Sequence, residues 1–243
     1  AFVFLTEKGD VLKYDVQNNM SNVLFSTIDK YVVYHDGGFD PLSPSSIYTL
    51  DDIIVVVNDY KTHGFVYNST QNYLIRLQRG DYCADISKFP IAFFKSKTGD
   101  TNLIYSDDWN HLQIVDLTTR RILTADKSLI EENAEAWHIN SCKEHGEGNK
   151  LFWPTPYDYF YGGLEMSPDE SKFLSKGWAW GSVDSLRLYD TADFINNHRI
   201  RDKEVFFGEH IGRSACFIDN NSIAFICGTG TLDEKEPWNI GVY

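Results

Sequence analysis

One short sequence pattern occurs five times in this chain, and it restricts the fold more than any other feature. Each copy is a stretch in which apolar and polar residues alternate, and four copies end in an Asp or Asn that follows a large apolar residue. These pairs are Tyr14-Asp15, Tyr67-Asn68, Val115-Asp116 and Tyr189-Asp190, and Tyr243 ends the fifth copy. Successive copies lie 53, 48, 74 and 54 residues apart. Alternation with a period of two is typical of a β-strand, so the pattern predicts one β-structured unit repeated along the chain.

Three further segments align around each copy. A continuously apolar segment precedes it, at residues 2–5, 53–57, 103–105, 173–174 and 223–226. A segment that ends in an acidic or Asn turn comes earlier still, at residues 47–52, 93–100, 164–169 and 216–220. An outer segment follows the pattern, at residues 22–26, 73–78, 121–125 and 204–207. Continuous apolarity predicts strands buried on both faces, and four short strands in roughly 50 residues are typical of a β-propeller blade. The predicted fold is an all-β propeller with four-stranded antiparallel blades.

Five repeats are visible, and the outer two are incomplete. With the strands labelled a to d, the first repeat lacks strand a and the fifth lacks strand d. A closed ring needs both strands, and natural proteins avoid the open edges that an unclosed array would have. We therefore expect residues 1–243 to form a single propeller domain that is part of a larger ring. A five-bladed ring closed by an external pair of strands is the alternative.

Two of the repeats resemble a known family. Residues 166–174, running on to residues 185–190, look like one blade of a WD-repeat protein with Tyr-Asp in the place of Trp-Asp, and residues 93–116 look like a looser copy. The chain lacks the Gly-His pair of the strict repeat, so the hydrogen-bonded tetrad of that family is not expected. It is most similar to divergent WD-repeat-like β-propellers among uncharacterised bacterial proteins. The resemblance implies a rigid platform for partners, usually without catalysis.

The longest step between repeats contains an insertion at residues 127–159. Ser128 and Glu131 have the spacing of a capping box, which predicts a short helix over residues 128–138. Long insertions on propellers either carry function or cover the opening of the ring, and the sequence leaves both open.

The chain is acidic, and this restricts its partners. It has 35 acidic and 22 basic side chains and a formal net charge of −13. Duplex nucleic acid and anionic membranes require basic residues that neutralise phosphates, so we expect neither as a partner. A protein partner with a basic surface fits this charge better.

The cysteines and the lack of long apolar segments favour a cytoplasmic protein. The four cysteines are far apart and form no Cys-x-x-Cys pair, so we expect free thiols and neither a disulfide framework nor a metal site. No apolar run approaches the ~20 residues that a membrane helix needs, and no signal peptide is visible. The chain begins in the middle of a repeat, so this prediction leaves open that a leader has been removed.

One end of the blades collects the aromatic residues. In an up-and-down blade the b–c and d–a connections emerge on the same face, and all six tryptophans fall in or beside these connections. Because tryptophan dominates many interface hot spots, this face is the predicted partner-binding site. The predicted binding residues are Trp109, His111, Trp178, Trp180, Trp238, Asp107 and Asp108. The alternative for Trp109, Trp178 and Trp180 is that they fill space between blades.

The sequence favours a non-catalytic scaffold that binds a protein partner, with no cofactor. It contains no Gly-x-Ser-x-Gly elbow and no paired histidines with the spacing of a zinc site. The acids that open the b–c turns are of a kind that caps backbone N–H groups without further function. The alternative is a propeller hydrolase or lyase that acts on a carbohydrate or another small ligand in the central channel.

Overall fold

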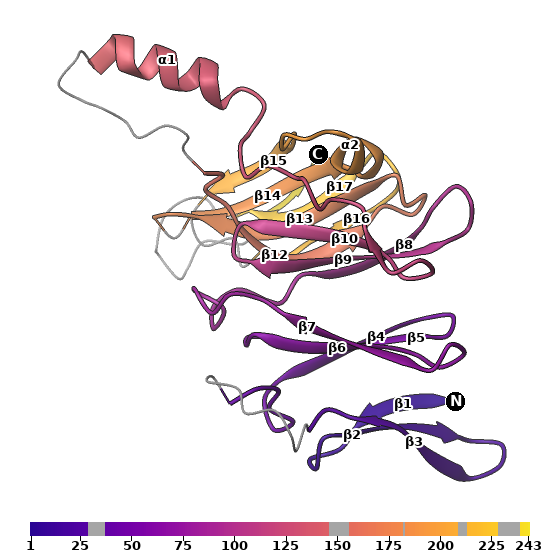
Figure 1. The fold of residues 1–243 in the computed structure, drawn as a ribbon. Helices are drawn as coiled ribbons and strands as arrows, with labels where there is room; N and C mark the ends of the chain where they lie inside the picture. Colours follow the sequence, from indigo (N-terminus) through magenta and orange to yellow (C-terminus); the bar gives the residue numbers. More distant parts are fainter. Residues whose placement is uncertain (29–36, 146–155, 182, 209–212, 228–238) are drawn as a thin grey trace. The chain divides into compact units, whose positions relative to one another are not determined.

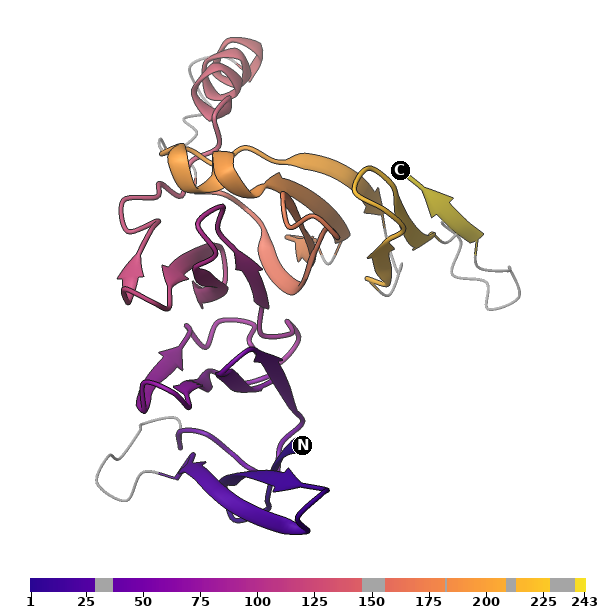
Figure 2. The same ribbon diagram turned by 90° about the vertical axis from the view of Figure 1, so that its right-hand side faces the viewer.

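The described part of the chain consists of five β-sheets that follow one another in sequence. The computed structural model describes residues 1–28, 37–145, 156–181, 183–208, 213–227 and 239–243. Figures 1 and 2 show that each sheet has a narrow range of colours, because its strands are consecutive in the chain. Hydrogen-bonded neighbours in every sheet follow the order of the sequence.

The strands have the following bounds. The first sheet contains β1 (Phe2–Leu5), β2 (Asp10–Asp15) and β3 (Met20–Ser26), and the second contains β4 (Ser45–Leu50), β5 (Ile53–Asn58), β6 (His63–Asn68) and β7 (Tyr73–Gln78). The third contains β8 (Ile91–Lys95), β9 (Thr101–Asp108), β10 (His111–Asp116) and β11 (Arg121–Ile122). The fourth contains β12 (Phe160–Met166), β13 (Lys172–Ala179), β14 (Val183–Asp190) and β15 (Lys203–Gly208), and the fifth contains β16 (Ala215–Phe217), β17 (Ile223–Cys227) and β18 (Asn239–Val242).

This architecture confirms the predicted fold class, an all-β chain of antiparallel propeller blades. The second, third and fourth sheets have four strands, and the first and fifth have three. The repeated pattern also takes equivalent positions. Tyr14 pairs with Phe2 at the start of β1, and Tyr67 and Tyr189 pair with the second residues of β5 and β13.

In the first four sheets, the Asp or Asn of the repeated pattern ends the strand before the last one and binds the backbone that follows it. Asp15 Oδ1 accepts the N–H of Gln17 at 2.9 Å, and Asn68 Oδ1 accepts the N–H groups of Thr70 and Gln71 at 3.0 and 2.7 Å. Asp116 makes the same bonds in the third sheet. Asp190 instead caps the helix α2 (Thr191–Asn196) by accepting the N–H of Asp193 at 2.8 Å. Short side chains of this kind satisfy backbone donors that a tight turn leaves open, which explains why the pattern recurs.

The chain divides into two compact units. The first unit comprises Ala1–Phe89 and Asp107–Trp109, and the second comprises Pro90–Ser106 and Asn110–Tyr243. Val11, Phe25, Phe39, Ile54, Val56 and Phe65 form the core of the first unit. The larger core of the second unit is rich in aromatic residues and includes Phe94, Tyr159, Tyr161, Phe173, Tyr189 and Phe194.

Two details differ from the expectations. β5 is buried throughout, as its continuous apolarity predicts, but the equally apolar β1 is not, because Phe2 and Phe4 are 66% and 40% exposed. In the first unit, β1 contributes only the opposite face of its sheet, through Val3 and Leu5, to the core. The side chains of Phe2 and Phe4 therefore lie on the outer face of the unit.

The capping-box prediction for residues 128–138 is wrong. The helix α1 is Ala134–His145, and Ser128 Oγ accepts only the N–H of Ile130, at 3.2 Å. The segment before α1 pairs with residue 200 instead, since Ile200 donates its N–H to Ile130 and accepts the N–H of Glu132. This pairing makes Glu131 an isolated bridge residue, and the helix begins after it. No helix in the described residues is long and apolar enough to span a membrane.

Candidate functional site

In the first unit, the connection between β7 and β8 forms a compact loop, residues 79–89, at the end of the second blade. Both of its ends are tied to the β5–β6 turn. Arg79 donates its N–H to the carbonyl of Thr62 at 2.9 Å, and Phe89 donates its N–H to the carbonyl of Asp59 at 2.7 Å. Two internal turns complete the loop, with bonds from Ala84 to Asp81 and from Ile86 to Cys83. The loop is therefore folded by its own hydrogen bonds.

The buried side chain of Arg79 holds the interior of this loop. Its guanidinium donates to the carbonyls of Lys61, Ala84 and Ser87 at 2.9, 2.9 and 2.8 Å and lies 4.7 Å from the centre of the Phe89 ring. Burial lowers the pKa of this guanidinium to about 10, and the nearby Asp59 carboxylate opposes that effect. Hydrogen bonds from a charged donor contribute more than neutral ones, so Arg79 fixes the shape of the loop.

The turn between β9 and β10 lies against this loop. Gly80 donates its N–H to the carbonyl of Asp107 at 3.0 Å, and Asp108 Oδ1 accepts the N–H of Trp109 at 2.7 Å. A Cβ atom on Gly80 would lie 2.6 Å from Asp108 Oδ1. Glycine at position 80 thus leaves room for the Asp108 carboxylate to lie against the loop.

Loop and turn together present an aromatic and acidic surface. Tyr82 is 46% exposed, Trp109 is half-buried, and their ring centroids lie 5.9 Å apart with the planes at 70°. Ile86 is also exposed, as are the carboxylates around the rings. We call this surface the loop surface; it comprises Asp81, Tyr82, Asp85, Ile86, Asp108 and Trp109. Asp81 and Asp85 form no ion pair with any residue that the structure describes.

The structure thus brings two of the predicted site residues, Asp108 and Trp109, into the loop surface, and Asp107 is bonded to the loop through its backbone carbonyl. The d–a connection supplies the other residues of the loop surface, which sequence reasoning did not select. A signal for them was present, because Asp81, Tyr82 and Asp85 lie on the predicted face. The segment at residues 79–89 contains neither tryptophan nor histidine, the residue types on which the predicted site chiefly depends.

The remaining predicted residues lie elsewhere. In the second unit, Trp178 is 4% exposed and stacks on Phe160 with ring centroids 3.8 Å apart. This is the alternative given above for Trp178, in which it fills space in the blades. Trp180 is 55% exposed and meets the edge of the same cluster, and His111 begins β10 with a half-buried side chain. Trp238 lies outside the described residues.

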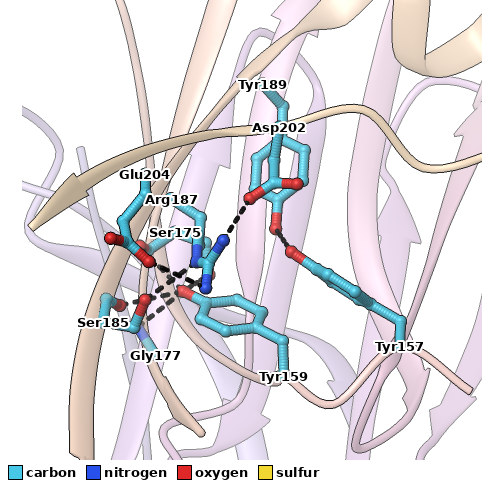
Figure 3. A network of polar contacts seen from close by, with 9 residues as sticks. All are labelled: Tyr157, Tyr159, Ser175, Gly177, Ser185, Arg187, Tyr189, Asp202 and Glu204. Carbon is cyan, nitrogen blue, oxygen red and sulfur yellow. Dashed lines mark hydrogen bonds and ion pairs between the residues drawn. The ribbon is translucent and has the colours of Figure 1, made fainter. Parts of the chain in front are cut away.

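In the second unit, a network of polar contacts lies inside the fourth sheet (Figure 3). Arg187 pairs with Asp202 at 2.8 Å and with Glu204 at 3.1 Å, and its Nε donates to Ser185 Oγ at 2.9 Å. The hydroxyl of Tyr159 lies 3.0 Å from both the carbonyl oxygen and Oγ of Ser175, to which it donates. It accepts the N–H of Gly177, also at 3.0 Å. These bonds join Tyr159, just before β12, to β13 and β14, and join β14 to β15, so the network has a structural role.

The tyrosines of this network are unsuited to acid–base chemistry near neutral pH. Tyr157 and Tyr189 share a hydrogen bond of 2.8 Å between their hydroxyls, and both side chains are at most 4% exposed. Burial raises the pKa of Tyr157, Tyr159, Tyr161 and Tyr189 above the usual value. A catalytic acid or base works best with a pKa close to the working pH, and these shifts move the hydroxyls away from it.

A surface cavity of about 350 Å³ lies near the network in the second unit. Its lining residues are Lys172, Leu188, Asp190, Asp193, Arg201, Asp202 and Lys203. Each of the three carboxylates is already engaged: Asp190 caps α2, Asp193 pairs with Arg201, and Asp202 pairs with Arg187. In the described residues no group of three or more His, Cys, Asp or Glu side chains is arranged to hold a metal ion.

Comparison with known proteins finds solved structures that are similar to this chain in fold. No protein-family model matches the chain, and no curated protein matches its sequence. The chain is similar to the β-propeller domain of Cps50 (Swd1) from Myceliophteria thermophila, at 9% identity and a TM-score of 0.40, over 92% of this chain and 61% of that one. It thus spans less than two thirds of the length of that structure.

Two other solved structures are similar to a comparable degree. One is a Bacteroides uniformis protein assigned as a 6-phosphogluconolactonase, at 12% identity and a TM-score of 0.42, over 99% of this chain and 66% of that one. The other is Hsv2p of Kluyveromyces lactis, at 9% identity and a TM-score of 0.38, over 100% of this chain and 71% of that one. At these identities the likeness does not extend to activity, substrate or partner.

Proposed function

We propose that the protein is a non-catalytic scaffold that binds a protein partner through the loop surface. The observation that carries this proposal is the contact between the exposed Tyr82, on a loop whose shape Arg79 already fixes, and the half-buried Trp109. Aromatic side chains contribute most of the binding energy at many interfaces. A loop that is folded before binding loses little entropy when the partner docks.

The charge of the loop surface supports a partner with a basic contact region. Asp81, Asp85 and Asp108 are exposed around the two rings. Within the loop, Arg79 is buried and Lys88 lies 3.8 Å from the Asp59 carboxylate, so neither cation neutralises these acids at the surface. Charge complementarity of this kind chiefly accelerates association and weakens with added salt.

A photo-crosslinking amino acid at position 82 tests the proposal in cells of the source organism. Position 74 provides the matched control, since Leu74 is 41% exposed but belongs to β7 and not to the loop surface. We expect a defined partner to crosslink from position 82 and not from position 74. Combining Asp81→Asn with Asp85→Asn should reduce the yield and make it less sensitive to salt.

Gly80→Ala provides a second, independent check. The added Cβ would displace the Asp108 carboxylate from its place against the loop without removing any exposed side chain. We expect the crosslink from position 82 to become weaker and less sensitive to salt while circular dichroism of the β-sheets is unchanged. Equal crosslinking from positions 82 and 74 would overturn the proposed function.

A further inference from the structure

We propose that the corner between Tyr82 and Trp109 seats a cationic side chain, an arginine or a lysine, of the bound partner. This inference rests on the proposed function and adds the chemistry that the loop surface recognises. Three observations support it: the angle between the two rings, the exposed carboxylates beside them, and the rigid attachment of both segments.

The two rings form two walls of a corner. Their planes meet at 70° with centroids 5.9 Å apart, so the edge of one ring lies against the face of the other. A cation placed in the corner therefore contacts two aromatic surfaces at once. The faces of Tyr and Trp carry negative electrostatic potential, and Trp attracts cations most strongly of the aromatic side chains.

The carboxylates select a cation over a neutral or anionic group. Asp108 precedes Trp109 directly, and its Oδ1 is held by the Trp109 N–H at 2.7 Å. Asp81 precedes Tyr82, so each ring has an exposed carboxylate next to it in the chain. An anion at the corner would meet both carboxylates and the negative ring faces, whereas an arginine or lysine would be attracted by all of them.

The corner is also held in place before binding. Tyr82 belongs to the loop that Arg79 fixes, and Trp109 follows the turn bonded to Gly80. Because these contacts use backbone groups and buried side chains, the rings are positioned independently of the partner. A preformed corner gives measurable affinity even to a single cationic residue.

The test uses amino-acid derivatives that differ only in charge. N-acetyl-arginine methylamide is titrated into the ¹⁵N-labelled protein, and N-acetyl-citrulline methylamide, which has the same shape without the charge, is the neutral comparison. The indole N–H signal of Trp109 is the readout, identified by its loss in Trp109→Phe. We expect the arginine derivative to shift this signal with a dissociation constant in the millimolar range, and the citrulline derivative to bind at least about three-fold more weakly.

Variants assign the binding to the corner. Tyr82→Leu should weaken arginine binding about three- to five-fold, whereas Tyr82→Phe, which keeps the ring, should leave it nearly unchanged. Tyr60→Leu is the matched control, because Tyr60 is 46% exposed but lies in the β5–β6 turn. Asp81→Asn should weaken binding and reduce its dependence on salt.

The outcomes separate this inference from the proposed function. Equal shifts with arginine and citrulline, or equal effects of Tyr82→Leu and Tyr60→Leu, would overturn the cation seat even if a partner crosslinks from position 82. Selective arginine binding at Trp109 without a partner crosslink at position 82 would support the seat and contradict the scaffold function.

Discussion

The loop surface of the first unit and the tyrosine network of the second contain the same kinds of residue in opposite states. Both combine aromatic rings, an arginine and carboxylates; Arg79 is buried and Arg187 is partly buried. In the network, Arg187 binds the carboxylates directly and the tyrosines are at most 4% exposed. In the loop surface, Arg79 binds backbone carbonyls only, so Asp81 and Asp85 remain exposed beside Tyr82.

This difference shows that the partner of the arginine decides what the surrounding groups can do. A guanidinium paired with carboxylates neutralises their charge and holds strands together. A guanidinium that binds carbonyls shapes a loop and leaves the acids of that loop available to another molecule. Composition is alike in the two regions, and the assignment of function depends on burial and on hydrogen-bond partners.

The largest expected effect separates two tryptophans that lie close together in the sequence. Trp178→Ala should lower the free energy of unfolding by about 3–5 kcal/mol, because it opens a cavity where the indole stacks on Phe160. Trp180→Ala should cost no more than about 1 kcal/mol, because that side chain is 55% exposed. Urea denaturation of both variants measures the difference, and similar costs would show that Trp178 is not the filler of its blade.

A smaller effect is expected from a single hydroxyl of the network. Tyr159→Phe leaves the N–H of the buried Gly177 without its acceptor, which should cost about 1–3 kcal/mol. The same change at the exposed Tyr60 should be nearly neutral. Thermal denaturation compares the two variants, and a neutral Tyr159→Phe would mean that the Figure 3 network is not what ties the fourth sheet together.

The smallest effect concerns pH and compares the two buried cations that bind carbonyls. Lys127 donates to the carbonyls of Phe194 and Asn197 at 2.6 and 2.9 Å, and burial lowers its pKa to about 8. At a pH between this value and the higher pKa of a lysine in the unfolded chain, the unfolded state binds more protons than the folded state. The free energy of unfolding should therefore rise with pH, by about 1 kcal/mol from pH 7 to 9.

Lys127→Met tests the pH prediction, since its stability should lack this rise. Arg79→Met should keep the rise, because the pKa of Arg79 is about 10 and its guanidinium stays charged over this range. Stability curves at pH 7, 8 and 9 check both variants. A rise that persists in Lys127→Met would assign it to another group.

The sequence predicts the blades well because their signal is local. Alternation, continuous apolarity and the Asx turn at Asp15, Asn68 and Asp116 each require only a few neighbouring residues. The strand order follows, since consecutive antiparallel strands pair without long crossovers. The error at residues 128–138 has the opposite cause, because a distant segment at residue 200 competes for the backbone of residues 130–132.

The candidate site could be predicted only in part. The sequence placed Asp107, Asp108 and Trp109 in a b–c turn, whereas in the structure Asp107 and Asp108 end β9 and only Trp109 lies in the turn that follows. It gave no means to see that Arg79 would be buried or that Gly80 would allow the loop to approach that turn. The bonds of Arg79 join residues 5, 8 and 18 positions apart, and Gly80 meets Asp107 of a different sheet, so no local pattern records these contacts.

The central claim is that the loop surface binds and the buried aromatic residues of the fourth sheet support the fold. The most direct measurement determines partner affinity and unfolding free energy on the same preparations of Trp109→Leu and Trp178→Leu, with the partner recovered from position 82. The account predicts that Trp109→Leu weakens binding by roughly 2 kcal/mol and changes stability by less than about 1 kcal/mol. It predicts the reverse for Trp178→Leu, whose folded fraction should bind normally. If Trp109→Leu unfolds the protein while the molecules that remain folded bind the partner with full affinity, the claim is contradicted.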